Sequence, residues 1–511
     1  MVFLVGGGPG DPGLITVRGA ELLATADVVL HDELVHPALL ELVKPEAEVR
    51  FVGKRGADRS SKQAKQDAIE VELVALAQMG KRVVRLKGGD PYLFGRGSEE
   101  AEALANAGIA FEVVPGVCSP LGATAYAGFS LTHRDHASSV VFISGTTRAG
   151  KPFDFGELAL IRGTVCILMG MHNIDVMVRG LLDAGGRSPE TPAAVIQWGT
   201  HAEQRVVSGN LGEIVSLARE AKLGSPGIII VGAAAERREH LRWFDTRPLF
   251  GKHVLVMRPR AQTREVAKRI REKGGQAILW PAIEIVSPAN PEPMRELVRH
   301  LGDYDIVVLT SENSAEQLFE VIANEGLDAR AFGRAKVAAV GTSTMATLTR
   351  FGIRADIVPD EFHGDGLAEA ILRQSFVQQQ LSAAQPVRIA FPRALVAREV
   401  LPEKLRAAGC DVHLVTAYET QKAGPEKHAE LVRLFEEKRV DVVLLSASSI
   451  ADVLADALGA RAAELLEGVI VASIGDVTTA TARKRGLNVT LTAQTSTMDG
   501  LIAALEAYLT S

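Results

Sequence analysis

Two glycine-rich segments near the N-terminus combine backbone freedom with charged side chains, which suits the binding of a small molecule. They are Gly6–Pro12 (GGGPGDP) and Arg85–Gly97 (RLKGGDPYLFGRG), and each follows a short apolar run. Glycines there let the backbone approach a ligand closely. Pro9 and Pro12 remove backbone donors, so the first segment is not a dinucleotide-binding turn. We expect one shared site at the carboxyl edge of a sheet. A tight turn without a ligand is the alternative for the first segment.

Cationic side chains recur at predicted loops of the same half. They are Lys54, Arg55, Lys87, Arg96, His133 and Arg134. The whole chain has 56 Lys and Arg against 62 Asp and Glu, a net charge of −6, so it is not a uniformly basic nucleic-acid binder. Converging cations would form a basic pocket for a small polyanion, because arginine holds carboxylates bidentately. Solvated surface charge is the alternative interpretation.

Asp32 ends a predicted strand and is a candidate general base, with an ordinary loop or capping carboxylate as the simpler interpretation. The three cysteines, Cys118, Cys166 and Cys410, are odd in number and far apart. They favour neither a disulfide framework nor a metal site, and they indicate a reducing compartment such as the cytoplasm. We expect no signal peptide, because the N-terminus lacks a cationic region. We expect no membrane span, because apolar runs stay short of about 18 residues.

Short apolar runs alternate with amphipathic stretches, which predicts an α/β fold with mainly parallel sheets. The strands predicted for the first half are Val2–Val5, Val28–His31, Arg82–Leu86, Phe111–Val114, Ser139–Ser144, Thr164–Met169, Ala193–Gln197 and Gly227–Val231. Lys62–Met79 has helical spacing, and Ser98 is a predicted N-cap of a further helix. The charged, proline-containing stretch Leu241–Lys252 predicts the main domain boundary.

The second half contains an internal repeat with three landmarks at a nearly constant offset. The pairs are Asp305–Ser311 with Asp441–Ser446, Ala339–Thr342 with Ser473–Asp476, and His363–Ala368 with Met498–Ala503. Two repeats are too few for a solenoid. They predict a bilobal α/β protein with two similar lobes.

The first half carries motifs whose order resembles that of uroporphyrinogen-III C-methyltransferases. Between Met1 and Phe244 they are GGGPGDPGLIT, ADVVLHDELV, VGKRG, VVRLKGGDPYLFGRG, VPGV, AYAGFSLTHRD, LMGM, QRVVSG and SPGIIIVG. The resemblance implies a tetrapyrrole-methylase fold over residues 1–245, with α/β subdomains at about 1–114 and 115–245. It also implies S-adenosylmethionine as cofactor, a homodimer formed through this half, and methylation of uroporphyrinogen III at C2 and C7 to precorrin-2. Eight carboxylates on that substrate agree with a cationic pocket.

The same resemblance assigns roles to individual residues. It implies Asp32 as proton acceptor and Lys54 as proton donor. It implies cofactor contacts at Pro9, Gly88, Gly89, Asp90, Leu93, Cys118, Ser119, Met169, Gly199 and Gly227. Cys118-Ser119 and Glu70 depart from the family pattern of Thr-Ala and Asn. Ser119 still offers a hydroxyl, so we expect cofactor binding to be retained.

Residues 252–511 place Ser/Thr-rich loops at predicted helix starts, where they bind carboxylates or simply cap the helices. Their landmarks resemble those of uroporphyrinogen-III synthases: Arg258-Pro259, Thr310-Ser311-x-Asn313, Val340-Gly341-Thr342, Gly364–Leu367, Tyr418-x-Thr420 and Ile474–Thr478. The resemblance implies cyclisation of hydroxymethylbilane with inversion of ring D and without a cofactor. It implies one lobe of about 252–283 plus 421–511 and another of about 288–415, with Pro281–Pro288 and Val415–Lys422 as crossing strands.

Tyr418 matches the tyrosine that the synthase resemblance connects with loss of the substrate hydroxyl. Candidate contacts to substrate carboxylates in this half are Arg258, Thr310, Ser311, Asn313, Gly341, Thr342, Arg393, Ser446, Ser448 and Thr478. The product implied for this half is the substrate implied for the first. The sequence therefore predicts a bifunctional enzyme of the sirohaem and cobalamin branch, with polycarboxylate tetrapyrroles as partners and neither nucleic acid nor membrane. Two alternatives stay open: a methylase of a later corrin intermediate with a degenerate second half, and a non-enzymatic tetrapyrrole sensor.

Overall fold

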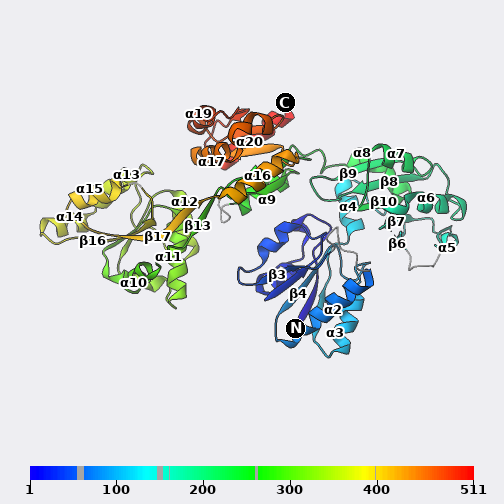
Figure 1. Ribbon diagram of the computed structural model, residues 1–511, viewed down its shortest axis with the longest axis horizontal. Helices are drawn as coiled ribbons and strands as arrows, with labels where there is room; N and C mark the ends of the chain where they lie inside the picture. The colour runs from blue at the N-terminus through cyan, green and yellow to red at the C-terminus, as the bar shows by residue number, and fades with distance from the viewer. Residues whose placement is uncertain (54–61, 147–152, 160, 259–262, 398) are drawn as a thin grey trace. The chain divides into compact units, whose positions relative to one another are not determined.

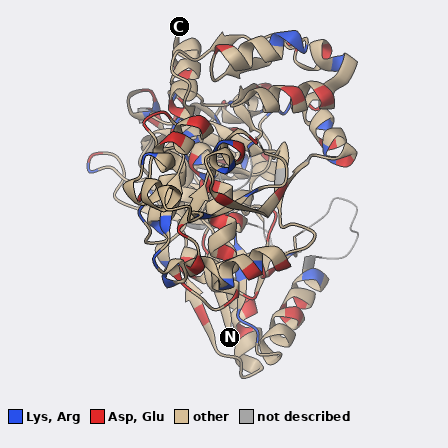
Figure 2. Ribbon diagram, turned by 90° about the vertical axis from the view of Figure 1, so that its left-hand side faces the viewer, with Lys and Arg blue, Asp and Glu red and all other residues tan. Residues whose placement is uncertain are grey.

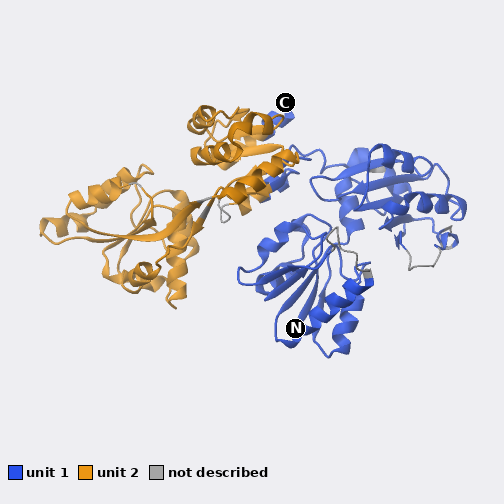
Figure 3. Cartoon of the chain, viewed as in Figure 1, with its two compact units in different colours: residues 1–254, 268–277, 506–511 blue, residues 255–267, 278–505 orange. Residues whose placement is uncertain are grey.

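The computed structural model describes residues 1–53, 62–146, 153–159, 161–258, 263–397 and 399–511. The chain forms two compact units (Figure 3). Unit 1 comprises Met1–Val254, Lys268–Ala277 and Glu506–Ser511, and unit 2 comprises Leu255–Ala267 and Ile278–Leu505. The described residues form four five-stranded sheets with helices packed around them (Figure 1). Among these residues, no helix is both long and apolar enough to cross a bilayer.

The first sheet is entirely parallel. Its strands, in spatial order, are β3 (Glu48–Phe51), β2 (Val28–His31), β4 (Val83–Lys87), β1 (Val2–Gly6) and β5 (Phe111–Val114). The helices that accompany it are α1 (Val17–Thr25), α2 (Lys62–Gln78) and α3 (Gly97–Asn106). Buried apolar residues form one cluster around Leu4 and Leu73 and another around Val5 and Leu22. The inner strands are buried on both faces, which is why they are continuous apolar runs in the sequence.

Two local details of this subdomain differ from or add to the prediction. The sequence set no bounds for β3, because its Glu-Val-Arg-Phe sequence alternates charge and apolarity at the sheet edge. Ser98 is not an N-cap: α3 begins at Gly97, and its N-cap is Arg96 in the left-handed region at φ 59°. The predicted helix over Lys62–Met79 is confirmed as α2.

The second sheet is mixed. Its order is β6 (Val140–Ser144), β7 (Thr164–Leu168), β10 (Gly227–Val231), β8 (Pro192–Gln197) and β9 (Arg205–Asn210). Only β6 and β7 pair in parallel; the other pairs are antiparallel, so the expectation of mainly parallel sheets fails here. The helices are α4 (Ser119–Ala127), α5 (Phe155–Ala159), α6 (Ile174–Asp183), α7 (Ile214–Glu220) and α8 (Arg238–Leu241). α4 packs against this sheet, since Ala123 and Ile196 share one buried cluster.

The second half contains two more sheets. One is ordered β12 (Gln276–Leu279), β11 (His253–Val256), β18 (Val442–Leu445), β19 (Ile470–Ser473) and β20 (Leu491–Thr492). The other is ordered β13 (Ile283–Val286), β17 (Asp411–Lys422), β16 (Arg388–Ala394), β14 (Ile306–Leu309) and β15 (Lys336–Ala339). The helices are α9 (Arg264–Glu272), α10 (Glu292–Arg299), α11 (Glu312–Asn324), α12 (Thr342–Arg350), α13 (Gly364–Leu372), α14 (Ser375–Ser382), α15 (Val400–Ala407), α16 (Pro425–Glu436), α17 (Ser448–Leu458), α18 (Ala462–Leu465), α19 (Asp476–Lys484) and α20 (Met498–Thr510).

The two copies of the sequence repeat lie in different sheets. In the first copy β14 leads into α11 and β15 into α12; in the second β18 leads into α17 and β19 into α19. Each pair of strands is parallel, with Ile306 opposite Lys336 and Val442 opposite Ile470. β13 and β17, within the segments expected to cross between lobes, pair antiparallel with Ile283 opposite Lys422.

Candidate active sites

The two glycine-rich loops meet at the carboxyl edge of the first sheet, as predicted. β1 and β4 are neighbours, and the Gly89 N–H donates to the Gly8 carbonyl at 2.7 Å. The loop after β5 joins them at Gly116. A Cβ on Gly116 would lie 2.2 Å from the Gly89 carbonyl oxygen, and a Cβ on Gly6 would lie 2.6 Å from the Gly116 Cα. We call this meeting of Gly6, Gly89 and Gly116 the glycine platform. Three strand ends touch there backbone to backbone, which side chains would prevent.

Asp90 fastens the glycine platform. One of its carboxylate oxygens accepts the Tyr92 N–H at 2.8 Å, and the other accepts the Gly116 N–H at 3.0 Å. The side chain thus ties the loop after β4 to the loop after β5. Leu93 lies half-buried in the same loop, and Gly88 packs towards Leu34. The role of these residues as cofactor contacts stays a prediction.

The start of α4 adjoins the platform. The Ser119 N lies 3.7 Å from the position of a Cβ on Gly89, and a Cβ on Gly122 would meet the Pro9 Cγ at 2.4 Å. Cys118 precedes the helix and is 9% exposed, and burial raises the pKa of its thiol. That thiol is therefore no activated nucleophile. The structure brings Pro9, Gly89, Cys118 and Ser119 together, as the sequence predicted.

The second subdomain contributes strand-end residues held in strained conformations. Met169, after β7, has φ 55°, and Trp198 and Thr200, after β8, have φ 49° and 73°. Non-glycine residues rarely adopt these angles, and such strain concentrates at functional sites. Gly199 brings this loop onto α4, because a Cβ there would lie 2.4 Å from the Ala123 Cβ. Gly227 begins β10 and packs against Met171.

Sequence reasoning missed Thr200, which connects the subdomains. Its Oγ1 accepts the Asp11 N–H at 2.9 Å, while the Tyr126 hydroxyl donates to the Asp11 carboxylate at 2.6 Å. Burial and the neighbouring Asp11 raise the pKa of Tyr126. The first glycine-rich loop is therefore anchored to the second subdomain. No sequence pattern marks this contact, because the partners are separated by more than a hundred residues.

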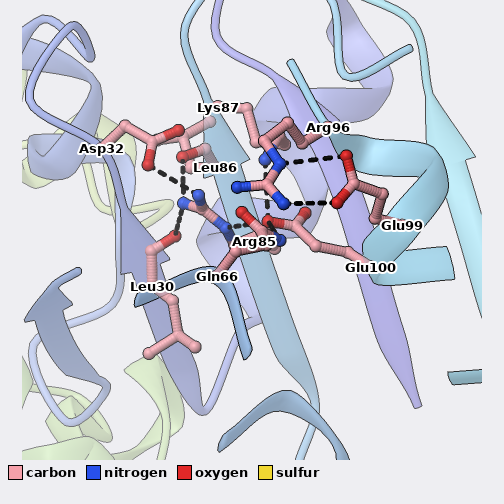
Figure 4. Close-up of polar contacts among 9 residues, drawn as sticks. All are labelled: Leu30, Asp32, Gln66, Arg85, Leu86, Lys87, Arg96, Glu99 and Glu100. Carbon is pink, nitrogen blue, oxygen red and sulfur yellow. Dashed lines mark hydrogen bonds and ion pairs between the residues drawn. The ribbon is translucent and has the colours of Figure 1, made fainter. Parts of the chain in front are cut away.

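Asp32 belongs to a largely buried ion network (Figure 4). Its Oδ1 accepts Arg85 Nη2 at 2.6 Å, and Arg85 Nε donates to Glu100 Oε1 at 3.1 Å. Lys87 Nζ and Gln66 Nε2 donate to the same Glu100 oxygen, at 2.8 Å and 3.3 Å. Arg85 is 2% exposed and Glu100 0%, whereas the Asp32 side chain is 30% exposed. Asp32 is the one member of the network that solvent reaches readily.

The network corrects the expectation that Lys87 and Arg96 offer positive charge to a substrate. Lys87 is 2% exposed and pairs with Glu100, and Arg96 binds both oxygens of Glu99 at 3.0 and 2.5 Å. The buried Lys87 needs a partner and finds it in Glu100, whereas Arg96 forms a partly exposed ion pair with Glu99. Burial and the nearby Arg85 charge lower the pKa of Lys87. For Arg85, burial alone would lower the pKa, but Asp32 and Glu100 together raise it.

The other cations predicted to converge lie elsewhere or are not described. His133 sits in a turn in which its N–H donates to the Ala137 carbonyl at 2.9 Å and its ring lies 4.6 Å from the His136 ring. Arg134 is exposed in that turn. Lys54 and Arg55 lie outside the described residues. Acidic and basic side chains are interspersed along the helices rather than gathered by sign (Figure 2).

A half-buried histidine pair, His36 and His201, lies beside the first glycine-rich loop. The two rings are 5.6 Å apart, and a Cβ on Gly10 would come within 2.3 Å of the His201 ring. Burial, followed by the charges of His201 and Arg271, lowers the pKa of His36 from 6.5 to about 4. Burial also lowers the pKa of His201. Both rings are therefore neutral in the folded protein at pH 7.

In the variant His36→Asn, the free energy of unfolding is expected to fall less steeply as the pH is lowered. Because the folded pKa of His36 is below its unfolded value, the unfolded chain takes up a proton first as the pH falls from about 6.5 towards 4. Asn keeps the acceptor that caps the Ala38 N–H but cannot be protonated. The loss of unfolding free energy between pH 7 and 4.5 should shrink by about 1–3 kcal/mol. Urea unfolding followed by tryptophan fluorescence measures this. Exposed His172→Asn is the control, and equal shrinkage in both variants would contradict the expectation.

The candidate site of the second half lies at the carboxyl ends of β14 and β16, beside Tyr418 within β17. Ser311 follows β14 and caps α11 by accepting the Ser314 N–H at 3.1 Å, and its Oγ lies 3.3 Å from the Tyr418 hydroxyl. The register of β16 and β17 shifts at Arg393/Ala394, which places Tyr418 opposite Ala394. Tyr418 is 7% exposed. Ser311 therefore serves as an N-cap and as a neighbour of Tyr418.

Two arginines predicted to bind substrate carboxylates have different surroundings. Arg393 is 6% exposed and donates to Glu399 Oε1 at 2.5 Å, while its buried Nη1 has no hydrogen-bond partner among the residues that the structure describes. Burial lowers the pKa of Arg258, against the opposing effect of Glu312. The remaining predicted contacts lie at helix starts. Thr310 and Asn313 flank the start of α11, Gly341 and Thr342 begin α12, Ser446 and Ser448 flank the start of α17, and Thr478 is buried in α19.

Comparison with known proteins identifies both halves. A family model of tetrapyrrole (corrin/porphyrin) methylases matches residues 1–215, and one of uroporphyrinogen-III synthase HemD matches residues 264–503. The protein is thus a fusion of a tetrapyrrole methylase and a uroporphyrinogen-III synthase, with the α/β fold class predicted from its sequence.

Two relatives that are matched over more than two thirds of this chain define its family. The chain is 33% identical over 506 residues to porphyrin biosynthesis protein HemD of Ruminiclostridium josui, covering 99% of this chain and 97% of that protein. It is 37% identical over 356 residues to uroporphyrinogen-III C-methyltransferase of Bacillus subtilis (strain 168), covering 69% of this chain and 72% of that protein. The chain therefore belongs to the HemD family of fused porphyrin biosynthesis proteins. A solved uroporphyrin-III C-methyl transferase from Thermus thermophilus is 36% identical, covering 46% of this chain and 97% of its own, with a TM-score of 0.39.

Proposed function

We propose that the chain is a bifunctional enzyme of tetrapyrrole biosynthesis. Its second half cyclises hydroxymethylbilane to uroporphyrinogen III with inversion of ring D. Its first half methylates uroporphyrinogen III at C2 and C7 to precorrin-2. The observation that carries the proposal is the match of a methylase family and a synthase family in consecutive parts of one chain, along the full length of a fused relative. The product of one reaction is the substrate of the other.

S-adenosylmethionine is the cofactor we propose for the first half. The glycine platform fits it: Gly6 and Gly116 leave no room for a Cβ, and Gly89 adopts φ 69°, so the loops present backbone rather than side chains. Pro9, Gly88, Cys118 and Ser119 would hold the molecule from the surrounding loops. When bound, its methyl sulfonium supplies an electrophilic methyl group. We propose no cofactor for the second half.

The chain's own residues must align the electron-rich pyrrole carbon and take up a proton as the ring bonding rearranges. Asp32 suits the second task because its carboxylate lies at the carboxyl end of β2, is partly exposed and is oriented by Arg85. The loops that face the platform, including the strained segment around Trp198, suit alignment. Lys54 remains a proposed proton donor on the strength of the resemblance.

Two substrate choices test the halves separately in the full chain. With hydroxymethylbilane alone, we expect uroporphyrinogen III rather than the type I isomer that forms spontaneously. With uroporphyrinogen III and S-adenosylmethionine, we expect a dimethylated product with the absorption of precorrin-2. Methylation without cyclisation would favour a methylase with a degenerate second half. Tight tetrapyrrole binding without either reaction would favour a sensor.

Two further properties belong to the proposal. The three cysteines are buried free thiols, which supports function in a reducing compartment, the cytoplasm.

We also propose a homodimer formed through the first half, as the resemblance implies. Sedimentation equilibrium tests this, and a monomer mass at micromolar concentration would exclude the dimer.

Tyr418→Phe is expected to slow formation of the type III isomer about tenfold or more. The change removes only the hydroxyl that lies 3.3 Å from Ser311 Oγ, so the buried ring keeps its packing. Methylation of supplied uroporphyrinogen III should be unchanged, which gives a control within the same molecule. Exposed Tyr508→Phe is the matched control variant. A type III rate equal to that of the unmodified protein would rule out this role for the Tyr418 hydroxyl.

A further inference from the structure

Arg85 fixes the position of Asp32 from within the protein. Besides its bonds to Asp32 and Glu100, its Nη1 donates to the carbonyls of Leu30 and Leu86 at 3.4 and 3.3 Å. Four acceptors from β2, β4 and α3 therefore surround one guanidinium that is 2% exposed. Figure 4 shows these contacts. They restrict the movement of the guanidinium, and therefore also that of the Asp32 carboxylate bound to it.

Glu100 anchors Arg85 from the opposite side. It lies in the first turn of α3, is 0% exposed, and accepts Gln66, Arg85 and Lys87 on one oxygen. Its other oxygen is buried and has no partner among the residues described. Burying ionised groups is costly, and apolar residues of similar volume often serve stability equally well.

We propose that Arg85 and Glu100 are positioning residues for methyl transfer: Glu100 holds Arg85, and Arg85 orients the Asp32 carboxylate and keeps positive charge beside it. The inference rests on the proposed function and extends it to residues that do not touch the substrate. The charged and titratable groups near Asp32 are His31 and Glu33 in its own segment, Arg85 and Lys87 from β4, and Glu100 from α3.

The test compares two variants of the full chain with uroporphyrinogen III and S-adenosylmethionine. Glu100→Gln keeps the shape and weakens the anchor, so kcat should fall about threefold to tenfold while KM for the cofactor stays within about twofold. The triple variant R85M/K87M/E100M replaces the buried charges with apolar side chains, a change that often preserves folding. It leaves Asp32 without a cation, so kcat should fall further.

Asp32→Asn makes the test specific. If Arg85 and Glu100 act through Asp32, adding Glu100→Gln to Asp32→Asn should cost no further activity. Glu112→Gln is the matched control, because Glu112 pairs with Arg18 at 2.9 Å in the same subdomain, away from Asp32. The stoichiometry of S-adenosylhomocysteine binding gives the folded fraction to which each rate is normalised.

The outcomes distinguish loss of the proposed activity from loss of the positioning role alone. Absence of methyl transfer by the unmodified chain and by Glu112→Gln would overturn the proposed function and the inference with it. A triple variant that binds S-adenosylhomocysteine and retains the kcat of the unmodified chain would overturn the inference alone. Additive losses in Asp32→Asn and Glu100→Gln would also overturn it. A decline in the folded fraction with an unchanged rate per folded molecule would show a structural role only.

Discussion

Asp32→Asn should lower kcat for methylation of uroporphyrinogen III by about 10²–10⁴-fold, the usual contribution of a general base. Asn preserves the size of the side chain and can still accept a hydrogen bond from Arg85, but it cannot take up the proton. Because Asp32 lies outside the glycine platform, the affinity for S-adenosylhomocysteine should be unchanged. Single-turnover methyl transfer and calorimetric titration measure the two quantities on the same preparation.

The neighbouring carboxylate provides the control for Asp32. Glu33→Gln removes one negative charge from the same loop, and Glu33 is exposed rather than tied to Arg85. Its kcat should stay within about twofold of the unmodified value. Equal losses in both variants would assign the effect to local charge and exclude a specific role for Asp32. An Asp32→Asn enzyme with full activity would remove Asp32 from the mechanism.

Gly116→Ala should weaken cofactor binding by about 10²-fold or more. Its new methyl group would lie 2.2 Å from the Gly89 carbonyl oxygen and within 3 Å of Gly6, and all of these neighbours are backbone atoms. Because no side chain can rotate away, the loops after β1 and β4 must separate, and the surface that we propose for the cofactor opens. Isothermal titration with S-adenosylhomocysteine gives the change in affinity directly.

Gly224→Ala is the matched substitution in the same unit. A Cβ there would make an ordinary contact of 3.6 Å with Gln197 Nε2. Its affinity for S-adenosylhomocysteine should stay within about twofold. Cyclisation of hydroxymethylbilane by Gly116→Ala should also be unchanged, since the clash lies in the other half of the chain. A Gly116→Ala protein with normal affinity would show that the cofactor binds away from the platform.

The sequence predicted the fold best where structure is local and repetitive. Strands such as β1 and β4 are buried on both faces, so continuous apolar runs predict them. Parallel pairing then brings the loops that follow these strands to one edge of the sheet. The repeat in the second half was readable because each copy keeps its own strand-loop-helix order. The bounds of edge strands such as β3 and β9 could not be predicted, because one exposed face admits polar residues.

The candidate site was harder to predict, because the sequence does not show which charged side chains are buried and paired inside the protein. Lys87 precedes a pair of glycines and was therefore predicted to bind a ligand. In the structure it forms a buried ion pair with Glu100 of α3. Arg85 lies in an apolar strand, and its sequence context does not reveal its contact with Asp32. The left-handed conformations of Met169 and Trp198 likewise depend on packing between strand ends rather than on residue type. These features require partners that are distant in the chain.

The strand order of the sheet that contains β11 bears on how the chain is made. β11 ends at Val256, but its inner neighbour β18 begins only at Val442, after the complete sheet of β13 to β17 has been synthesised. Domains generally fold in order as they leave the ribosome. The methylase part and the middle sheet are therefore finished first, while β11 and β12 wait with an unpaired edge. Nascent chains interrupted before Val442 would carry a methylase part joined to an incomplete synthase.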